Sequence, residues 1–142
     1  MREAFSYMKG TGMYPEQEYP YVGKTGLCKY RENLVKIQGF SSVAQGVDPL
    51  IQLLNLQPVS VAIDSHSAGF LNYVGGIYDG GCGSDFDHSV AVIGYGTDDS
   101  SGKDYWIIKN SWGETWGENG FMRLLRDESV CPITVDASFP IM

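Results

Sequence analysis

The sequence has little positive charge and no long apolar run. Its 10 lysines and arginines face 17 aspartates and glutamates, so the net charge is 10 − 17 = −7. Nucleic-acid binding needs a basic face for the phosphates, and this acidic balance argues against such a partner. No segment approaches the ~18 apolar residues of a membrane-spanning helix, so no membrane partner is expected. The opening residues 1–5 lack the apolar core of a signal peptide.

Cysteine is also scarce, with three residues, Cys28, Cys82 and Cys131. Their spacings match no Cys-x-x-Cys or zinc pattern, so we expect no metal and no cofactor. A metal site built from Cys82, His88 and His66 is a distant alternative that no spacing supports. An odd number of cysteines leaves one thiol unpaired, or paired with another chain.

The chain has 142 residues, enough for one domain with a core, and its 18 glycines predict a β-rich, loop-rich domain. Strands are predicted at 34–40, 59–64, 88–95, 104–109, 120–125 and 137–140. Helical segments are predicted at 1–9, 48–56 and 65–73. Asp48 can cap the second of these, Pro49 suits its first turn, and Pro140 should stop the last strand. An antiparallel, barrel-like sheet is the architecture these elements favour.

Two polar side chains lie where predicted strands begin and end. His88 opens one strand, Asn110 follows the next, and the polar loop 97–103 joins them as a hairpin. Pairing of the two strands would bring the side chains together. An Asn oxygen can accept from one imidazole nitrogen and fix the ring, which leaves the other nitrogen to act on a thiol. The alternative is that Asn110 is a simple turn residue.

The stretch from Tyr105 to Phe121 resembles the Asn-Ser-Trp-Gly-x-x-Trp-Gly block of papain-like cysteine peptidases of the papain and cathepsin L type. Further segments resemble that family's blocks in the same order, at 19–21, 57–63, 87–90 and 131–140. The resemblance covers essentially the whole chain. It implies an α+β, papain-like fold. Residues 33–142 would form mostly the antiparallel β-barrel (right-hand) domain with one short helix, and residues 1–32 a remnant of the helical left-hand domain with its connecting loop.

The resemblance also implies a thiol endopeptidase and assigns roles to residues. His88 would be the general base and then the acid that protonates the leaving amine, and Asn110 would orient it. Trp112 would cover the hydrogen bond between them and keep water out. Simple core packing is the alternative for Trp112 and the favoured interpretation of Trp116.

The substrate pocket follows from the same resemblance. Ala62, Phe86 and Asp136 match the positions that line the pocket for the second side chain before the scissile bond. Asp87, next to His88, would contribute a peptide group and a charge near the site. For both aspartates, a solvated carboxylate is an equally weighted alternative.

The resemblance implies a disulfide between Cys82 and Cys131. Cys28 matches a family cysteine whose partner lies upstream of this chain, so its thiol should be unpaired. Pro132 departs from the family pattern, which usually has Gly after the last cysteine.

The nucleophilic cysteine of the family is not found in the sequence. It should lie about 130–150 residues before the His and Asn partners, a count that falls before residue 1. None of the three cysteines has the required Cys-Gly-Ser/Ala-Cys-Trp context. We therefore expect a truncated chain that carries the His/Asn half of a site and does not cleave peptides alone. Its expected partners are a peptide or protein substrate and the missing N-terminal half.

A second hypothesis is a non-catalytic relative that binds peptides or a peptidase partner chain. The resemblance and the expected disulfide imply a lysosomal, vacuolar or secreted protein.

Overall fold

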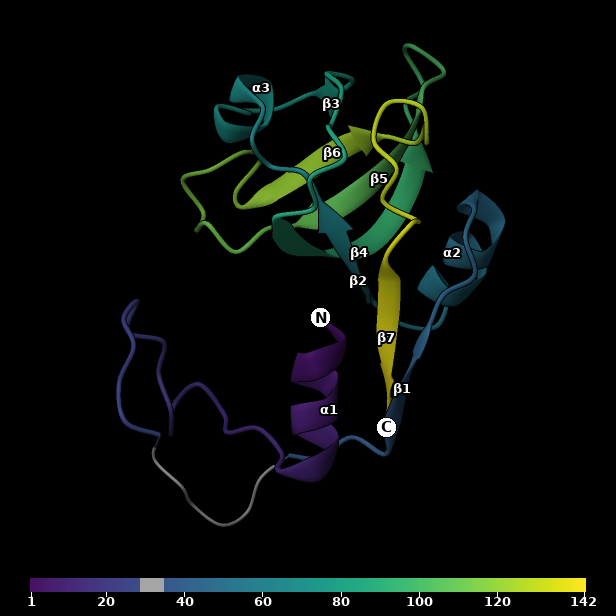
Figure 1. The fold of residues 1–142 in the computed structure, drawn as a ribbon. Helices are drawn as coiled ribbons and strands as arrows, with labels where there is room; N and C mark the ends of the chain where they lie inside the picture. Colours follow the sequence, from purple (N-terminus) through teal and green to yellow (C-terminus); the bar gives the residue numbers. More distant parts are fainter. Residues whose placement is uncertain (29–34) are drawn as a thin grey trace. The chain divides into compact units, whose positions relative to one another are not determined.

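The computed structural model describes residues 1–28 and 35–142, and these form two compact units (Figure 1). One unit comprises residues 2–41 and 140–142, and the other comprises Met1 and residues 42–139. The predicted domain boundary between residues 32 and 33 lies outside the described residues and stays a prediction.

The smaller unit contains the helix α1, Arg2–Gly10. Phe5, its buried residue, stacks on Phe40 with ring centroids 5.8 Å apart. An isolated bridge joins Met13 to Val35. Outside this bridge, residues 11–28 are irregular, as the prolines and glycines of the stretch predict.

The strand predicted over 34–40 begins later in the structure. Strand β1 spans Gly39–Ser42, and Gln38 donates its backbone N–H to the carbonyl oxygen of Ile141 at 2.8 Å. Leu34, where the prediction began, lies outside the described residues.

The described residues form one seven-stranded sheet in the order β1-β7-β2-β4-β5-β6-β3. Its remaining strands are β2 Val59–Ile63, β3 Ile77–Tyr78, β4 His88–Thr97, β5 Asp104–Lys109, β6 Phe121–Leu125 and β7 Ala137–Ile141. The predicted antiparallel pairing is confirmed for β2 with β4 and β7, and for β5 with β4 and β6. The short pair β3–β6 is parallel, so the sheet is mixed.

Alternation along the central strands builds the core. In β5, Trp106 and Ile108 are fully buried, and in β6 the same is true of Met122 and Leu124. Each buried side chain is two residues from the next because successive strand residues point to opposite faces. Burial of one such side chain stabilises the fold by about 1.5–3 kcal/mol.

The helix α2, Val47–Leu54, lies beside β2 and β4 (Figure 1). The prediction that Asp48 caps it is wrong. The helix begins one residue earlier, after Gly46, whose φ of 116° suits glycine, and Asp48 lies in the first turn. An acidic side chain in the first turn still stabilises the helix, because it lies near the positive end of the helix dipole.

The short helix α3, Ala68–Leu71, is capped by Ser67, whose hydroxyl accepts the backbone N–H of Phe70 at 3.1 Å. The prediction that Pro140 stops the last strand is also wrong, since β7 continues to Ile141. Among the described residues, no helix combines the length and the apolar character needed to cross a membrane.

Candidate active site

His88 and Asn110 lie side by side at one end of the β4–β5 hairpin. His88 is the first residue of β4, Asn110 directly follows β5, and Ala91 pairs with Lys109 between them. The ring nitrogen Nε2 of His88 lies 2.8 Å from Oδ1 of Asn110. The structure therefore brings together the two residues that the sequence analysis placed at the centre of a site.

The hydrogen bonds of Asn110 fix which imidazole nitrogen carries the hydrogen. Ser111 donates its backbone N–H to Oδ1 of Asn110 at 2.8 Å, so this atom is the amide oxygen. An amide oxygen only accepts, so Nε2 of His88 must be the donor. In the neutral ring Nδ1 then holds the lone pair, and this is the nitrogen that can take a proton.

Trp112 covers this pair. Its ring stacks on the ring of His88, with centroids 5.0 Å apart and planes inclined by 25°. The indole is itself held by edge-to-face contacts with Phe70 at 5.6 Å and with Trp116 at 5.4 Å. Phe70 is fully buried, whereas Trp112 remains 37% exposed. The exposed ring of Trp112 thus packs against the rings of Phe70 and Trp116.

Trp116 has the packing role expected of it. Its ring packs against Phe70 and Tyr73, with centroids 5.5 Å away in each case, and its Nε1 donates to the carbonyl oxygen of Leu71 at 3.2 Å. The apolar part of the indole thus packs against the core while its N–H has a hydrogen-bond partner.

Glycine shapes the loop between β5 and β6. Gly117 has φ of 58°, and a Cβ there would overlap the carbonyl oxygen of Phe121. The loop closes through the backbone N–H of Gly120, which donates to Trp116, and that of Asn110, which donates to Gly120. Asn110 is only 5% exposed and is held at both its backbone and its side chain.

The structure brings together some of the predicted pocket residues. The backbone N–H of Ala62 donates to the carbonyl oxygen of Asp136 at 3.0 Å, and Ala62 pairs with Ser89 across β2 and β4. Ala62 is buried, Asp136 is partly buried and Phe86 is 36% exposed. Ala62 lies on the strand next to β4, Phe86 lies two residues before β4, and Asp136 bonds to the other edge of β2. The binding role of all three stays a prediction.

Asp87 is bound to the loop that follows β2. Its Oδ1 accepts the backbone N–H of Ser65 at 2.8 Å, and its Oδ2 accepts the Ser65 hydroxyl, also at 2.8 Å. These bonds show a carboxylate that orders the neighbouring loop. The residue is exposed, so its carboxylate is both solvated and hydrogen-bonded, and its contribution to the site stays a prediction.

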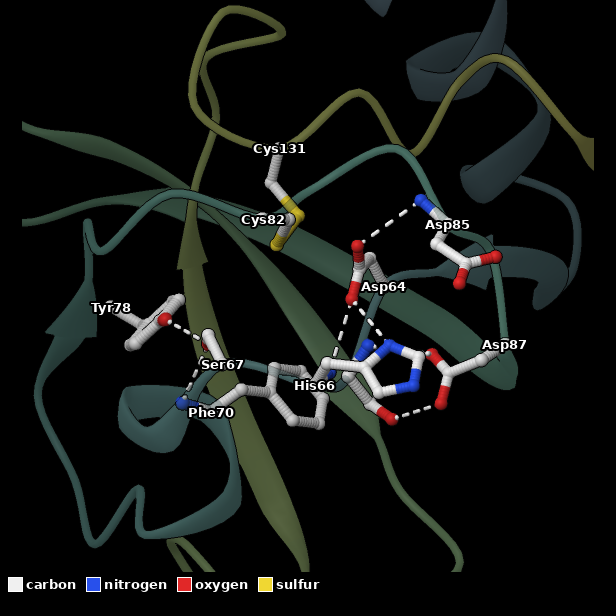
Figure 2. Close-up of a disulfide and its surroundings, with 10 residues drawn as sticks. Asp64, His66, Ser67, Phe70, Tyr78, Cys82, Asp85, Asp87 and Cys131 are labelled. Atoms are coloured by element: carbon white, nitrogen blue, oxygen red, sulfur yellow. Dashed lines mark hydrogen bonds and ion pairs between the residues drawn. A yellow bond between two sulfur atoms is a disulfide. The ribbon is translucent and has the colours of Figure 1, made fainter.

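The same loop contributes a cluster that sequence reasoning missed. Asp64, His66 and Asp87 point toward one another in Figure 2, and Nδ1 of His66 lies 3.1 Å from Oδ1 of Asp64 and 3.8 Å from Oδ1 of Asp87. One carboxylate follows β2 and the other precedes β4. The pairing of Ile63 with His88 makes these two segments neighbours, and predicting that pairing would have revealed the cluster.

Hydrogen bonds shift the pKa values of Asp64, His66 and Asp87. The pKa of Asp64 is lowered, mainly because the backbone N–H of His66 donates to it. The pKa of His66 is raised, first by its hydrogen bond to Asp64 and then by the charge of Asp87. The pKa of Asp87 is lowered, mainly by the backbone N–H of Ser65. All three shifts favour charged groups.

The implied disulfide between Cys82 and Cys131 is present (Figure 2). It argues against the alternative metal site of Cys82, His88 and His66, since the sulfur of Cys82 is bound to Cys131 and is no thiolate ligand. Cys28 is exposed and forms no disulfide with another described residue.

Comparison with known proteins identifies the class of protein to which this chain is similar. Residues 1–141 match the model of the papain family cysteine proteases. The chain is 42% identical to cysteine endopeptidase Rep1 of Oryza sativa subsp. japonica and 44% identical to cysteine protease XCP2 of Arabidopsis thaliana. Each match covers 99% of this chain, but only 40% and 41% of the respective relative.

Solved structures agree. The ragweed pollen cysteine protease Amb a 11, in its proform, superposes with a TM-score of 0.93 at 38% identity, over 100% of this chain and 46% of that one. A Carica candamarcensis cysteine protease, CMS1MS2, in complex with E-64, gives 0.88 at 36% identity, over 99% and 67%. The class is therefore that of the cysteine proteases. This chain belongs to the papain family, and it spans about two fifths of the length of the curated relatives named above.

Proposed function

We propose that this chain supplies the His/Asn half of a cysteine endopeptidase active site. The observation that carries the proposal is the 2.8 Å hydrogen bond from Nε2 of His88 to Oδ1 of Asn110, under the ring of Trp112. This bond holds the ring in the tautomer whose other nitrogen can act as a base. The nucleophilic thiol comes from residues outside these 142.

The roles of the chain's own residues follow from that tautomer. Nδ1 of His88 takes the proton of the thiol, and the resulting thiolate attacks the carbonyl carbon of the scissile peptide bond. The imidazolium then gives the proton to the leaving amine. Asn110 keeps the ring oriented through both transfers, and Trp112 keeps water away from the hydrogen bond that orients it.

Peptides or proteins are the proposed substrates, and the upstream part of the protein is the proposed partner. Ala62, Phe86 and Asp136 line the proposed pocket for the second side chain before the scissile bond, with Asp87 beside them. A lysosomal, vacuolar or secreted location is proposed as well. The Cys82–Cys131 disulfide supports it, because such bonds persist in oxidising compartments.

Reconstitution tests the proposal. The chain is mixed with the N-terminal half of a papain-family protease, and hydrolysis of a fluorogenic peptide is measured for the native chain, for His88→Gln and for Ser100→Ala. Ser100 lies in the β4–β5 loop and serves as the control. We expect hydrolysis that is lost by about 10²–10⁴-fold in His88→Gln and retained in Ser100→Ala.

Hydrolysis that is insensitive to His88→Gln would contradict the proposal. Peptide binding without any hydrolysis in a folded, reconstituted complex would instead support the hypothesis of a non-catalytic relative.

A further inference from the structure

We propose that Asp64, His66 and Asp87 bind a divalent metal ion of the zinc class. The three side chains come from the end of β2 and from the residue before β4, and they form a site separate from the His88–Asn110 pair. The proposal does not depend on the peptidase function, since it needs only the fold of the chain.

The spacing of the ligand atoms fits one ion. One nitrogen of His66 and one oxygen of each aspartate lie within 4.8 Å of one another. Nδ1 of His66 lies 3.1 Å from the oxygen of Asp64 and 3.8 Å from that of Asp87. An ion bonded at about 2.0–2.2 Å holds neighbouring ligand atoms roughly 3–3.5 Å apart, so the exposed His66 ring and the partly exposed Asp87 carboxylate must both move toward Asp64 to bind one ion.

The two carboxylates are already oriented without an ion, by hydrogen bonds from neighbouring backbone N–H groups and a hydroxyl. Asp64 accepts the backbone N–H of His66 at 3.0 Å on Oδ1 and that of Asp85 at 3.1 Å on Oδ2. Asp87 accepts both the backbone N–H and the hydroxyl of Ser65. Such outer contacts fix the direction of metal ligands and raise affinity.

Glycine makes room for this arrangement. A Cβ at Gly83 would overlap Oδ2 of Asp64, so the chain can approach the carboxylate this closely only without a side chain. The loop that contains Gly83 is held by the neighbouring disulfide at Cys82 (Figure 2). The carboxylate of Asp64 is therefore held close to the backbone of this loop before any ion binds.

The donor set selects the metal. One imidazole nitrogen with two carboxylate oxygens suits Zn²⁺ and related ions, whereas Ca²⁺ and Mg²⁺ prefer oxygen ligands alone. The side chain of Asp64 is 10% exposed, that of Asp87 33% and that of His66 62%. One side of the site is thus open to water, which can occupy the remaining coordination position, and an ion there would tie the end of β2 to the start of β4.

The chain offers a direct test because it contains two histidines, His66 and His88. Zn²⁺ is titrated into the full 142-residue chain, with Cys28→Ser as the background so that the exposed thiol does not compete. Heat is measured by calorimetry, and the two imidazole signals are followed by NMR. His66→Gln and His88→Gln are matched variants of the two rings, and Mg²⁺ is the comparison ion.

We expect about one Zn²⁺ per chain, with the His66 signals shifting and those of His88 staying in place. His66→Gln should weaken Zn²⁺ binding by at least about tenfold, because the loss of a residue that merely supports a ligand already lowers metal affinity by that factor. His88→Gln should bind Zn²⁺ with the same affinity as the Cys28→Ser chain. Mg²⁺ should not shift the His66 signals.

Three results would overturn the proposal: no shift of the His66 signals, unchanged affinity in His66→Gln, or binding that is lost only in His88→Gln. Dispersed NMR spectra confirm that each variant is folded, so every outcome is informative.

Discussion

The ring of Trp112 lies over the ring of His88, with centroids 5.0 Å apart and planes inclined by 25°. This contact places an apolar surface against the imidazole whose Nε2–H donates to Asn110. A hydrogen bond that is screened from water is electrostatically stronger than an exposed one. The stacking therefore stabilises the orientation of the base as well as the fold.

Substitution of Trp112 should affect both properties. Trp112→Ala removes the stack on His88 and the edge-to-face contacts with Phe70 and Trp116. We expect the free energy of unfolding to fall by about 2 kcal/mol, because such aromatic pairs contribute about 0.5–1.5 kcal/mol each beyond their burial. Exchange of the His88 Nε2–H with solvent, measured by NMR, should become faster.

Trp112→Phe keeps a flat ring over His88 and is the control for that change. It should recover most of the stability and most of the protection of the Nε2–H. Equal exchange rates in the native chain and in Trp112→Ala would show that the indole does not shield the bond.

Substitution of Asn110 should lower the activity of the reconstituted peptidase through the orientation of His88. Asn110→Ala removes the acceptor of the 2.8 Å bond and leaves the base in place but free to rotate. We expect kcat/KM to fall by about 10²-fold, within the range that positioned acid–base catalysis supplies. The measurement is hydrolysis of the same fluorogenic peptide.

Ser111→Ala is the matched control for Asn110→Ala. Ser111 contributes its backbone N–H to Asn110, and this donor survives the substitution. Its kcat/KM should stay close to that of the native chain, and a loss equal to that of Asn110→Ala would mean that the loop, not the hydrogen bond, carries the effect.

The β4–β5 hairpin and its two polar ends could be predicted from sequence. Residues 90–93 and 105–108 are runs of β-branched, aromatic and small apolar residues, and the polar loop between the strands leaves one simple way to pair them. His88 and Asn110 then fall at the same end of the hairpin, and the register of the pairing sets the contact between their side chains. Because the hairpin joins segments that are close in sequence, the proximity of His88 and Asn110 could be predicted without a structure.

Other features depend on contacts between distant segments. The two-residue strand β3 lies in a glycine-rich loop and owes its conformation to parallel pairing with Arg123 and Leu124 of β6, which no local pattern reveals. The cluster of Asp64, His66 and Asp87 likewise requires the pairing of β2 with β4. The cap of α2 at Gly46 shows the same limit on a smaller scale, since Asp48 is the better cap by residue type.

Removal of the disulfide should destabilise the larger unit. Cys82 and Cys131 are 49 residues apart in sequence, so opening the bond frees a long loop in the unfolded chain. The chain-entropy model gives a loss of about 4 kcal/mol. The measurement is chemical denaturation of the double variant Cys82→Ser, Cys131→Ser.

Cys28→Ser is the control for the disulfide variant, because Cys28 is exposed and unpaired within the described residues. Its denaturation midpoint should match that of the native chain. A double variant as stable as the native chain would contradict the structural role of the bond.

Stability should fall in acid partly through Glu118. Its carboxylate accepts two N–H groups of Arg123 and the backbone N–H of Gly76, and the hydrogen bonds to Arg123 in particular hold its pKa below the ordinary 4.5. A carboxyl with a lowered pKa in the folded state stabilises the fold above pH 4.5 and loses that contribution as the pH falls through the folded-state pKa.

The matched variants for this effect are Glu118→Gln and Glu114→Gln, the second at an exposed glutamate of the same loop. Melting temperatures are compared between pH 7 and about pH 3. The native chain should be the more stable at neutral pH, and its advantage over Glu118→Gln should shrink in acid. A gap that stays constant with pH would contradict the ion pair.

Gly117 should tolerate no side chain. Gly117→Ala places a Cβ against the carbonyl oxygen of Phe121 at φ of 58°. The control is Gly102→Ala, because Gly102 has a similar φ of 68° with open space around it. We expect about 1–2 kcal/mol of destabilisation for the control from the backbone alone, and a larger loss at Gly117. Equal denaturation midpoints for the two variants would contradict the overlap.

The sheet order has a consequence for how the chain folds. β2 pairs with β4 on one side and with β7 on the other, and Ser60 faces Ser138 across the second pair. During synthesis β2 leaves the ribosome well before β7 does, so its second edge has no partner until β7 follows. An apolar strand with an open edge can pair with other chains, so the protein is exposed to aggregation in the interval between the synthesis of β2 and that of β7.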